Sequence, residues 1–322
     1  MVKRIVHTDV SKEVRALLKQ TGEKDPAEAV RTVSRELLSQ FLTTFHSEQP
    51  PINVEALASF RSIGFAKEPP AYSDDAELVP DKKRGVVIRV NRDRPITRQR
   101  FSIGHEVGHT LFAGYDIKVQ CRKTRKRDWH DPSDVLEYLC DVASSEFIFP
   151  LEWFQADLDD QDITAERLLA LAIRYKASPE ATVRRFIDIC TQPTAAVFFR
   201  WKHKPADGAI RSSPARKVTR GGVRRQPLRK LRVDYSVCNA AFRALGIHIP
   251  AYKSVAESSV IHQSAVRGVC LDTNREYLDL GSFNGWFRIH ILPAYTKEAD
   301  IGPSGESGVI AVLQPVRKPR AK

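Results

Sequence analysis

The chain has 322 residues, a net charge of +12 and 42% hydrophobic residues, which is enough apolar material for two domains with buried cores. No stretch approaches the roughly 18 apolar residues of a membrane-spanning helix, and no apolar secretion segment follows the first four residues. Five widely spaced cysteines without a CxxC pair are typical of reduced thiols. The sequence therefore predicts a soluble, cytoplasmic protein without a membrane partner or a disulfide framework.

Two stretches near the start of the chain, residues 10–19 and 26–45, have the apolar spacing of helices. Pro26 suits the first turn of the second helix. The apolar residues of that helix fall on one face: Val30, Val33, Leu37, Leu38 and Phe41. We expect both helices to cover the core of a first domain. Residues 84–91 then predict a β-strand that ends in a turn.

The sequence His-Glu-Val-Gly-His at residues 105–109 is an HExxH motif. Residues four apart on an α-helix lie about one turn apart on the same face, so His105 and His109 can bind one metal ion. Glu106 lies at the edge of that face, where a carboxylate can act as a general base toward a metal-bound water. Thr97 is the expected N-cap of this helix. The motif predicts a metal-dependent peptidase.

A zinc site needs a third protein ligand, and a second predicted helix, ending near Pro150, offers candidates. Glu137 and Asp141 are four residues apart and share one face. Glu137 can therefore bind the metal while Asp141 orients a ligand histidine through its second ring nitrogen. Glu146 is the other acid of this helix, but it lies half a turn away from Glu137 and is expected to form a cap or a salt bridge. We therefore expect Glu137 as the third ligand.

HExxH followed by the block Glu137-x-x-Cys-Asp-x-Ala-Ser-Ser-Glu-Phe-Ile-Phe-Pro150 resembles the ImmA/IrrE family of metallo-endopeptidases. That family carries a similar Glu-x-x-Ala-Asn-x-Phe-Ala-Ala-x-Leu-Leu-Met-Pro block. At five positions this chain departs from the commonest letters: Cys140, Asp141, Ala143, Ser144 and Ser145. The resemblance covers roughly residues 25–190, and its specific motifs lie within residues 84–150.

The resemblance implies an endopeptidase that uses Zn2+, with Mn2+ as the alternative metal. It also implies the substrate class, a specific intracellular protein and most often a helix-turn-helix repressor whose cleavage releases stress-response or mobile-element genes. His130, Tyr115 and Tyr138 are candidates for donating a hydrogen bond to the transition state. An exposed loop histidine and two half-buried tyrosines are the simpler interpretation of these three residues.

Residues 163–189 predict a helix, a short break and a second helix with Ser178 as its N-cap, a pattern that resembles a helix-turn-helix. One interpretation is contact with DNA through Thr182, Arg184 and Arg185. The other is a helical pair that packs on the peptidase core. We favour packing, because the ImmA/IrrE family commonly places such helices beside its catalytic module.

Residues 200–232 contain 12 Lys or Arg and one acid, so this segment accounts for almost the whole net charge. Its many Gly, Pro and Ser residues predict a flexible basic loop over about 202–232. Such a loop can bind DNA phosphates or an acidic protein partner, or it can remain solvated and bind nothing specific. The candidate contacts are Arg216, Lys217, Arg220, Arg224 and Arg225.

The predicted fold class is α+β. Residues 1–150 are expected to form a mostly helical, zincin-like metallopeptidase domain with a small sheet, and residues 151–192 a helix-turn-helix-like segment packed on it. Residues 193–322 are expected to form a mixed α/β domain that contains the basic loop and serves as a sensor or substrate-recruitment module. This last domain has further predicted elements: strands at 194–201, 268–271, 276–280, 286–292 and 309–313, and a helix at 236–245.

Two other functions fit parts of the sequence. A DNA-binding transcriptional regulator would use residues 163–189 and the basic loop, and its affinity would fall steeply with salt and survive Glu106→Gln. A non-catalytic, zinc-binding adaptor would need the two histidines of the motif but not the acid between them. The presence of Glu106 therefore favours the peptidase over the adaptor.

Overall fold

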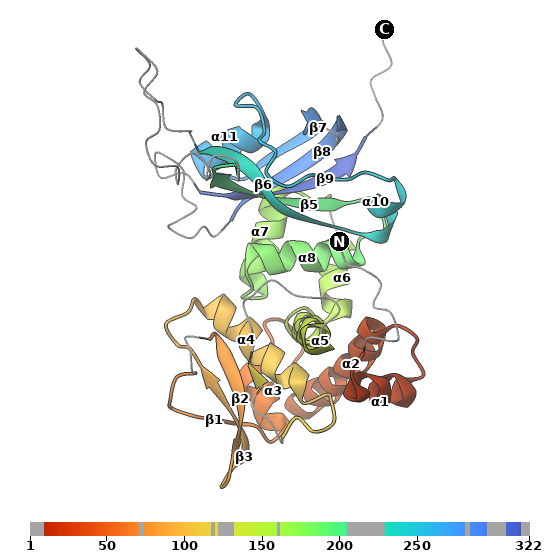
Figure 1. Ribbon diagram of the computed structural model, residues 1–322, viewed down its shortest axis with the longest axis vertical. Coiled ribbons are helices and arrows are strands. Elements are labelled where there is room, and N and C mark those ends of the chain that lie inside the picture. The colour runs from red at the N-terminus through yellow and green to blue at the C-terminus, as the bar shows by residue number, and fades with distance from the viewer. Residues whose placement is uncertain are drawn as a thin grey trace, which may run out of the picture. The chain divides into compact units, whose positions relative to one another are not determined.

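The computed structural model of the chain contains two compact units (Figure 1). It describes residues 10–70, 74–116, 120–121, 132–159, 162–204, 229–280, 284–294 and 307–316. The first unit comprises the chain up to Gln161 together with Leu171–Ala181, and the second comprises Asp162–Ala170 and the chain from Thr182 onward. Each unit combines helices with a sheet, so the α+β class is confirmed. Within the described ranges, no helix has the length and apolar character needed to cross a bilayer.

The first unit begins with helices that cover its core. Its helices are α1 (Lys12–Thr21), α2 (Pro26–Phe45), α3 (Val54–Phe60), α4 (Ile96–His109), α5 (Pro132–Ile148) and α6 (Leu151–Asp159). The side chain of Asp25 accepts hydrogen bonds from the backbone N–H groups of Ala27 and Glu28, and Pro26 occupies the first helical position of α2. The predicted apolar face of α2 is buried, namely Val30, Val33, Leu37, Leu38 and Phe41.

The sheet of the first unit has the strand order β1-β3-β2-β4. Its strands are β1 (Gly64–Phe65), β2 (Ala76–Asp81), β3 (Gly85–Val90) and β4 (Gln120–Cys121). β2 and β3 form an antiparallel hairpin. In its turn, the Asp81 side chain accepts hydrogen bonds from the N–H groups of Lys83 and Arg84, and Gly85 adopts a positive φ of 78° that suits glycine. β3 confirms the strand predicted at residues 84–91, and both β2 and β3 pack against α4.

The helix that carries the HExxH motif starts earlier than the sequence predicted. Pro95 occupies the N-cap position of α4, and no side chain makes a capping hydrogen bond there. Thr97 lies inside the first turn, so its prediction as the N-cap is wrong. Pro95 has the non-helical backbone of an N-cap, with φ −51° and ψ 142°, so the helix begins directly after it at Ile96.

α7 (Ala165–Arg174) and α8 (Pro179–Ile189) are the two helices of the predicted helix-turn-helix-like segment. The Ser178 hydroxyl accepts a hydrogen bond from the N–H of Ala181 at 3.1 Å, which confirms the predicted N-cap of α8. The division between the two units falls within both helices.

The side chains that would contact DNA from α8 are mostly buried. Thr182 and Arg185 are 0% and 1% exposed. Arg184 is exposed, and its guanidinium lies over the rings of Phe198 and Tyr235 at 5.5 and 5.2 Å from their centroids. A buried side chain does not reach a base edge. The burial of Thr182 and Arg185 therefore contradicts their interpretation as DNA contacts, and packing of α8 on the peptidase core stays a prediction.

The second unit is built on an antiparallel sheet with the strand order β6-β5-β9-β8-β7. Its strands are β5 (Ala195–Lys202), β6 (Lys230–Cys238), β7 (Leu271–Asp279), β8 (Asn284–Pro293) and β9 (Val309–Pro315). One face carries a core of alternating apolar residues that includes Val197, Phe199, Ile289, Ile291 and Leu313. α11 (Val260–Arg267) packs against β7, β8 and β9, while α10 (Ala240–Ala244) follows β6.

The second unit corrects three predictions. The helix predicted at 236–245 begins only at Ala240, because residues 236–238 continue β6. The basic loop predicted over about 202–232 ends earlier, because Lys230–Arg232 pair with β5 as the start of β6. The two strands predicted between residues 268 and 280 are one strand, β7, with a register shift between Thr273 and Glu276.

Candidate metal centre

α4 is held at both ends by charged side chains of the first unit. Asp75 is 1% exposed and pairs with Arg94 and Arg98 at the start of the helix, at 3.0 and 2.7 Å. At the other end, the guanidinium of Arg61 donates a hydrogen bond to the carbonyl oxygen of Thr110 at 3.0 Å. A cation at this end also suits the helix dipole. These contacts fix the position of the HExxH helix.

Two glycines bring α5 into close contact with α4. A Cβ on Gly104 would lie 2.6 Å from Oγ of Ser144. A Cβ on Gly108 would lie 3.0 Å from Cβ of Ala143 and 3.1 Å from the carbonyl oxygen of Cys140. Because each glycine directly precedes a histidine of the motif, the histidines stand where the two helices are closest. The site therefore requires glycine at these two positions of α4, because a larger residue would push α5 away.

Polar contacts also fix α5 in register. Glu146 is fully buried and pairs with Arg31 and Arg35 of α2 at 3.5 and 3.1 Å, so the predicted salt bridge is confirmed. The Ser144 hydroxyl donates a hydrogen bond to the carbonyl oxygen of Phe101 on α4 at 2.7 Å. α5 is thus anchored to helices on two sides, which places the face that contains Glu137 opposite the motif.

The predicted ligand residues come together between α4 and α5. Nε2 of His105 lies 3.2 Å from Oε2 of Glu137, and Nε2 of His109 lies 3.6 Å from Oε1 of the same carboxylate. His105, Glu106, His109 and Glu137 are all at most 6% exposed. Among the residues that the structure describes, neither Nε2 atom has a hydrogen-bond partner. Two imidazole nitrogens and one carboxylate, aimed at one point, fit a zinc ion.

The other nitrogen of each imidazole faces α5 as well. Nδ1 of His105 lies 2.8 Å from Oδ1 of Asp141. Nδ1 of His109 lies 3.3 Å from Sγ of Cys140. Residues 137, 140 and 141 are three and four positions apart and therefore share one face of the helix. One face of α5 thus contacts both histidines through both of their ring nitrogens.

The electrostatics of the site favour a positive charge between the helices. Burial lowers the pKa of His105, but the hydrogen bond to Asp141 and the nearby carboxylate of Glu137 outweigh it and raise the pKa to about 9. Burial and the charge of His105 lower the pKa of His109 to about 3. Burial raises the pKa of Glu137, but contacts with His105 and His109 lower it overall. A divalent cation bound here would satisfy the same carboxylates.

Cys140 is the site residue that sequence reasoning missed as a metal-site side chain. His105, His109 and Cys140 offer ligand atoms that lie within 4.8 Å of one another, and all three residues are buried. The signal in the sequence was the spacing, because Cys140 is three positions from Glu137 and adjacent to Asp141. The contact of its sulfur with Nδ1 of His109 places it on the side of the ring away from Nε2.

The remaining predicted site residues are placed as follows. Tyr115 is half-buried in the turn after α4, and Tyr138 is half-buried on α5. His130 lies outside the described residues, and so do the candidate contacts of the basic loop, namely Arg216, Lys217, Arg220, Arg224 and Arg225. The proposed roles of these residues remain predictions.

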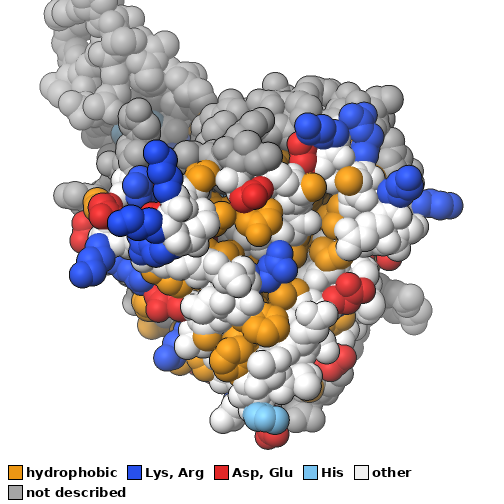
Figure 2. Space-filling model, turned by 90° about the horizontal axis from the view of Figure 1, so that it is seen from below, with side chains coloured by type: hydrophobic (Ala, Val, Ile, Leu, Met, Phe, Trp, Pro, Cys, Tyr) orange, Lys and Arg blue, Asp and Glu red, His pale blue; other side chains and the backbone are white. Residues whose placement is uncertain are grey.

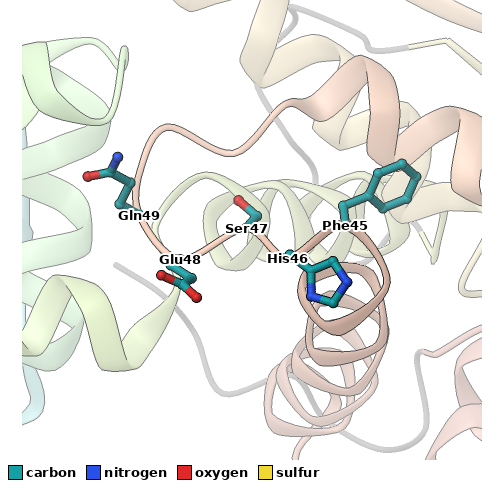
Figure 3. Close-up of a pocket in the computed structure, with 5 residues that line it drawn as sticks. All are labelled: Phe45, His46, Ser47, Glu48 and Gln49. Atoms are coloured by element: carbon teal, nitrogen blue, oxygen red, sulfur yellow. The ribbon is translucent and has the colours of Figure 1, made fainter.

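A pocket of about 610 Å³ lies elsewhere, after the end of α2. It is lined by residues 45–49: Phe45, His46, Ser47, Glu48 and Gln49. Figure 3 shows that these side chains fan out from the turn and do not converge on one point. The pocket contains none of the residues of the HExxH site.

Comparison with known families agrees with this geometry. Two histidines, a glutamate base candidate and a buried carboxylate define a metallopeptidase-like site. The family model of the IrrE N-terminal-like domain, Peptidase_M78, matches residues 67–186, which include both α4 and α5. Residues 67–186 therefore match the IrrE N-terminal-like domain, and the resemblance inferred from the motifs is confirmed.

Individual proteins resemble the chain only distantly. No curated protein matches the chain significantly. Among solved structures, a Mycobacterium tuberculosis transcriptional regulator is similar over 94% of this chain and 80% of its own, at 13% sequence identity and a TM-score of 0.48.

Proposed function

We propose that the chain is a metal-dependent endopeptidase of the IrrE type. The observation that carries the proposal is the convergence of two buried Nε2 atoms, from His105 and His109, on the carboxylate of Glu137. Glu106, fully buried, stands between the two histidines on the same helix. The match to the IrrE N-terminal-like domain over residues 67–186 supports it.

Each residue of the site has a distinct task in peptide hydrolysis. His105, His109 and Glu137 would hold the ion, and their nitrogen-rich set favours Zn2+ over Mn2+. The bound ion would supply Lewis-acid chemistry toward a water and the scissile carbonyl. The Glu106 carboxylate takes a proton from the attacking water and delivers it to the leaving amine nitrogen. Asp141 holds Nδ1 of His105 and so keeps its Nε2 directed into the site.

The proposed substrate is a specific protein, with a helix-turn-helix repressor as the expected class. This part of the proposal is supported by the resemblance to the ImmA/IrrE family. The second unit, with its five-stranded sheet, would then act as a sensor or as the module that recruits the substrate. Its separation as a compact unit is compatible with either task.

The test compares wild type with Glu106→Gln, each loaded with zinc or manganese, against a candidate helix-turn-helix repressor from the same genome. The proposal expects one discrete cut by wild type and none by Glu106→Gln, with the metal content and fold of the two proteins equal. Absence of a cut by metal-loaded wild type would reject this substrate. Failure of wild type to bind metal would reject the peptidase itself.

DNA binding is the weaker alternative. Two of the three α8 side chains that it requires, Thr182 and Arg185, are buried. On the described part of the face drawn in Figure 2, Lys and Arg occur together with Asp and Glu, and apolar side chains show between them. At this face, the mixture of charges offers a phosphate backbone less than a uniformly basic surface would. DNA affinity that falls steeply with salt and is unchanged in Glu106→Gln would favour this alternative.

A further inference from the structure

Cys140 contacts one of the two ligand histidines of the proposed metal centre. Its Sγ lies 3.3 Å from Nδ1 of His109, and its side chain is fully buried. His109 is 1% exposed, and its Nε2 has no hydrogen-bond partner among the described residues. The ring is therefore contacted by sulfur on one side and directed into the site on the other.

The contact of the second nitrogen decides which nitrogen binds the ion. A histidine that binds a metal through Nε2 carries its proton on Nδ1 and donates it to a further group. For His105 that group is the carboxylate of Asp141, at 2.8 Å. For His109 the atom in the equivalent place is Sγ of Cys140, one residue earlier on the same helix. The two ligand histidines thus have unequal supports, because sulfur is a weaker acceptor than a carboxylate.

We propose that Cys140 is a positioning residue of the metal centre: its sulfur accepts the Nδ1–H of His109 and thereby directs the Nε2 lone pair toward the ion. This inference rests on the proposed function. The ImmA/IrrE block most often has alanine at this position, and alanine offers no acceptor, so the support of His109 is a property of this chain and not of the family motif. The position of the sulfur is set by the close approach of Gly108 to the backbone of Cys140.

The same thiol has a second chemical possibility, direct ligation as a thiolate. His105, His109 and Cys140 are close enough for shared ligation. Against it stands the geometry of the contact, since Sγ meets His109 at Nδ1 while Nε2 faces Glu137. A sulfur ligand of the same ion would have to stand beside Nε2. The experiments below separate the two roles.

The first experiment measures zinc affinity of the full chain by competition with a chromogenic chelator. Cys140→Ala should bind zinc about tenfold more weakly than wild type, at the lower end of the roughly 10–100-fold losses seen for outer-shell partners. Cys140→Ser should retain most of the affinity, because its hydroxyl can accept the same hydrogen bond. Asp141→Ala, the matched change at His105, should lose more, toward about 100-fold. Equal affinity of wild type and Cys140→Ala would overturn the inference.

The second experiment reads the imidazoles directly. Long-range proton–nitrogen NMR spectra of the zinc-loaded wild type should show a protonated Nδ1 on His109, and Cys140→Ala should shift that signal while leaving the signals of His105 in place. With Co2+ in place of zinc, a near-ultraviolet charge-transfer band from sulfur that disappears in Cys140→Ala would show direct ligation and overturn the positioning role.

The zinc-affinity and NMR measurements test the role of Cys140 independently of the peptidase assay. If wild type binds zinc and Cys140→Ala binds it more weakly, the positioning role stands even when no protein is cleaved. If wild type cleaves its substrate but the two affinities are equal, only the positioning role fails. If wild type binds no zinc, both fail. Circular dichroism of each variant establishes that a lost affinity is not lost folding, and Cys140→Ser serves as the folded reference.

Discussion

Each unit of the chain contains a buried histidine whose Nδ1 contacts an aspartate, and the two pairs differ in what surrounds them. In the first unit His105 lies 2.8 Å from Asp141, and its Nε2 faces the carboxylate of Glu137. In the second unit His290 lies 2.6 Å from Asp272. The distances are alike, so the pair alone does not distinguish the two places.

The difference lies in the further partners of each pair. The Oδ1 atom of Asp272 also accepts a hydrogen bond from the backbone N–H of Ala165, at 2.9 Å, so this pair joins the start of α7 to the sheet. The neighbours of His290 along β8, Ile289 and Ile291, belong to an apolar core. Within the described residues, the group with metal-ligand distances contains His105 and not His290. A histidine–aspartate pair indicates a metal centre only where other ligand atoms converge on the free side of the ring.

The largest expected effect follows from removing a ligand. His105→Ala should weaken zinc binding by more than about 100-fold, since loss of a ligand exceeds the loss of an outer partner. His290→Ala should bind zinc as wild type does, because its pair serves to anchor a helix. Chelator competition on the two variants checks both statements. Equal losses in the two variants would mean that the two pairs are not distinct in function.

The pH dependence of zinc binding sharpens the same comparison. His105 has a pKa of about 9 in the metal-free protein, so at pH 7 a proton must leave before its Nε2 can bind zinc. Affinity should therefore rise about tenfold per pH unit from pH 7 toward 9 and level off above that pKa. His109, with a pKa of about 3, is already neutral over this range and adds no slope. Calorimetry in buffers of different ionisation enthalpy should show about one proton released at pH 7. Release of two would indicate that a thiol is also deprotonated.

A pair of glycine substitutions tests how far the close contact of the helices matters. Gly108→Ala places a methyl group 3.0–3.2 Å from Ala143 and the backbone of Cys140, and should cost about 1–3 kcal/mol of the free energy of unfolding and weaken zinc binding. Gly268→Ala, at the end of α11, meets no atom within 4 Å but adopts a φ of 67°. It should cost about 1 kcal/mol and leave zinc binding unchanged.

Urea unfolding with and without zinc measures both glycine variants. A Gly108→Ala protein that binds zinc like wild type would show that α4 and α5 can separate slightly without disturbing the ligands.

The smallest expected effect is on the anchor in the second unit. His290→Ala removes one partner of Asp272 but leaves the hydrogen bond from Ala165. The free energy of unfolding should therefore fall by about 1 kcal/mol. Amide hydrogen exchange should show this loss of stability locally, because the first amides of α7 should exchange faster than in wild type. Unchanged exchange there would mean that the helix cap alone holds the carboxylate.

The parts of the site that depend on helix periodicity could be predicted from the sequence. The spacing of His105, His109, Glu137 and Asp141 follows from the geometry of single helices, and the structure brings these four residues together. The spacing also places Cys140 on this face of α5, but which histidine nitrogen its sulfur meets depends on the distance between the two helices and could not be predicted.

In the second unit the charge of the sequence obscured a strand. Lys230 and Arg232 extended the predicted basic loop, yet Leu231 and Val233 are buried in the strand, and so is Arg232 itself. The period of two was present in the sequence, but the high charge of the preceding residues outweighed it in our interpretation. At α4, the N-cap was misplaced because Pro95 starts the helix without a capping side chain.

The three polar groups that α5 directs at the histidines can move only together, because they belong to one helix. Glu137, Cys140 and Asp141 stand on a single helical face, and adjacent positions on a helix differ by about 100° around the axis. A turn of α5 by one position would withdraw the carboxylate, the thiol and the second carboxylate from α4 in the same movement. The three groups therefore enter or leave the centre together, and the ion pairs of Glu146 with α2 and the hydrogen bond of Ser144 to α4 hold the helix in this orientation.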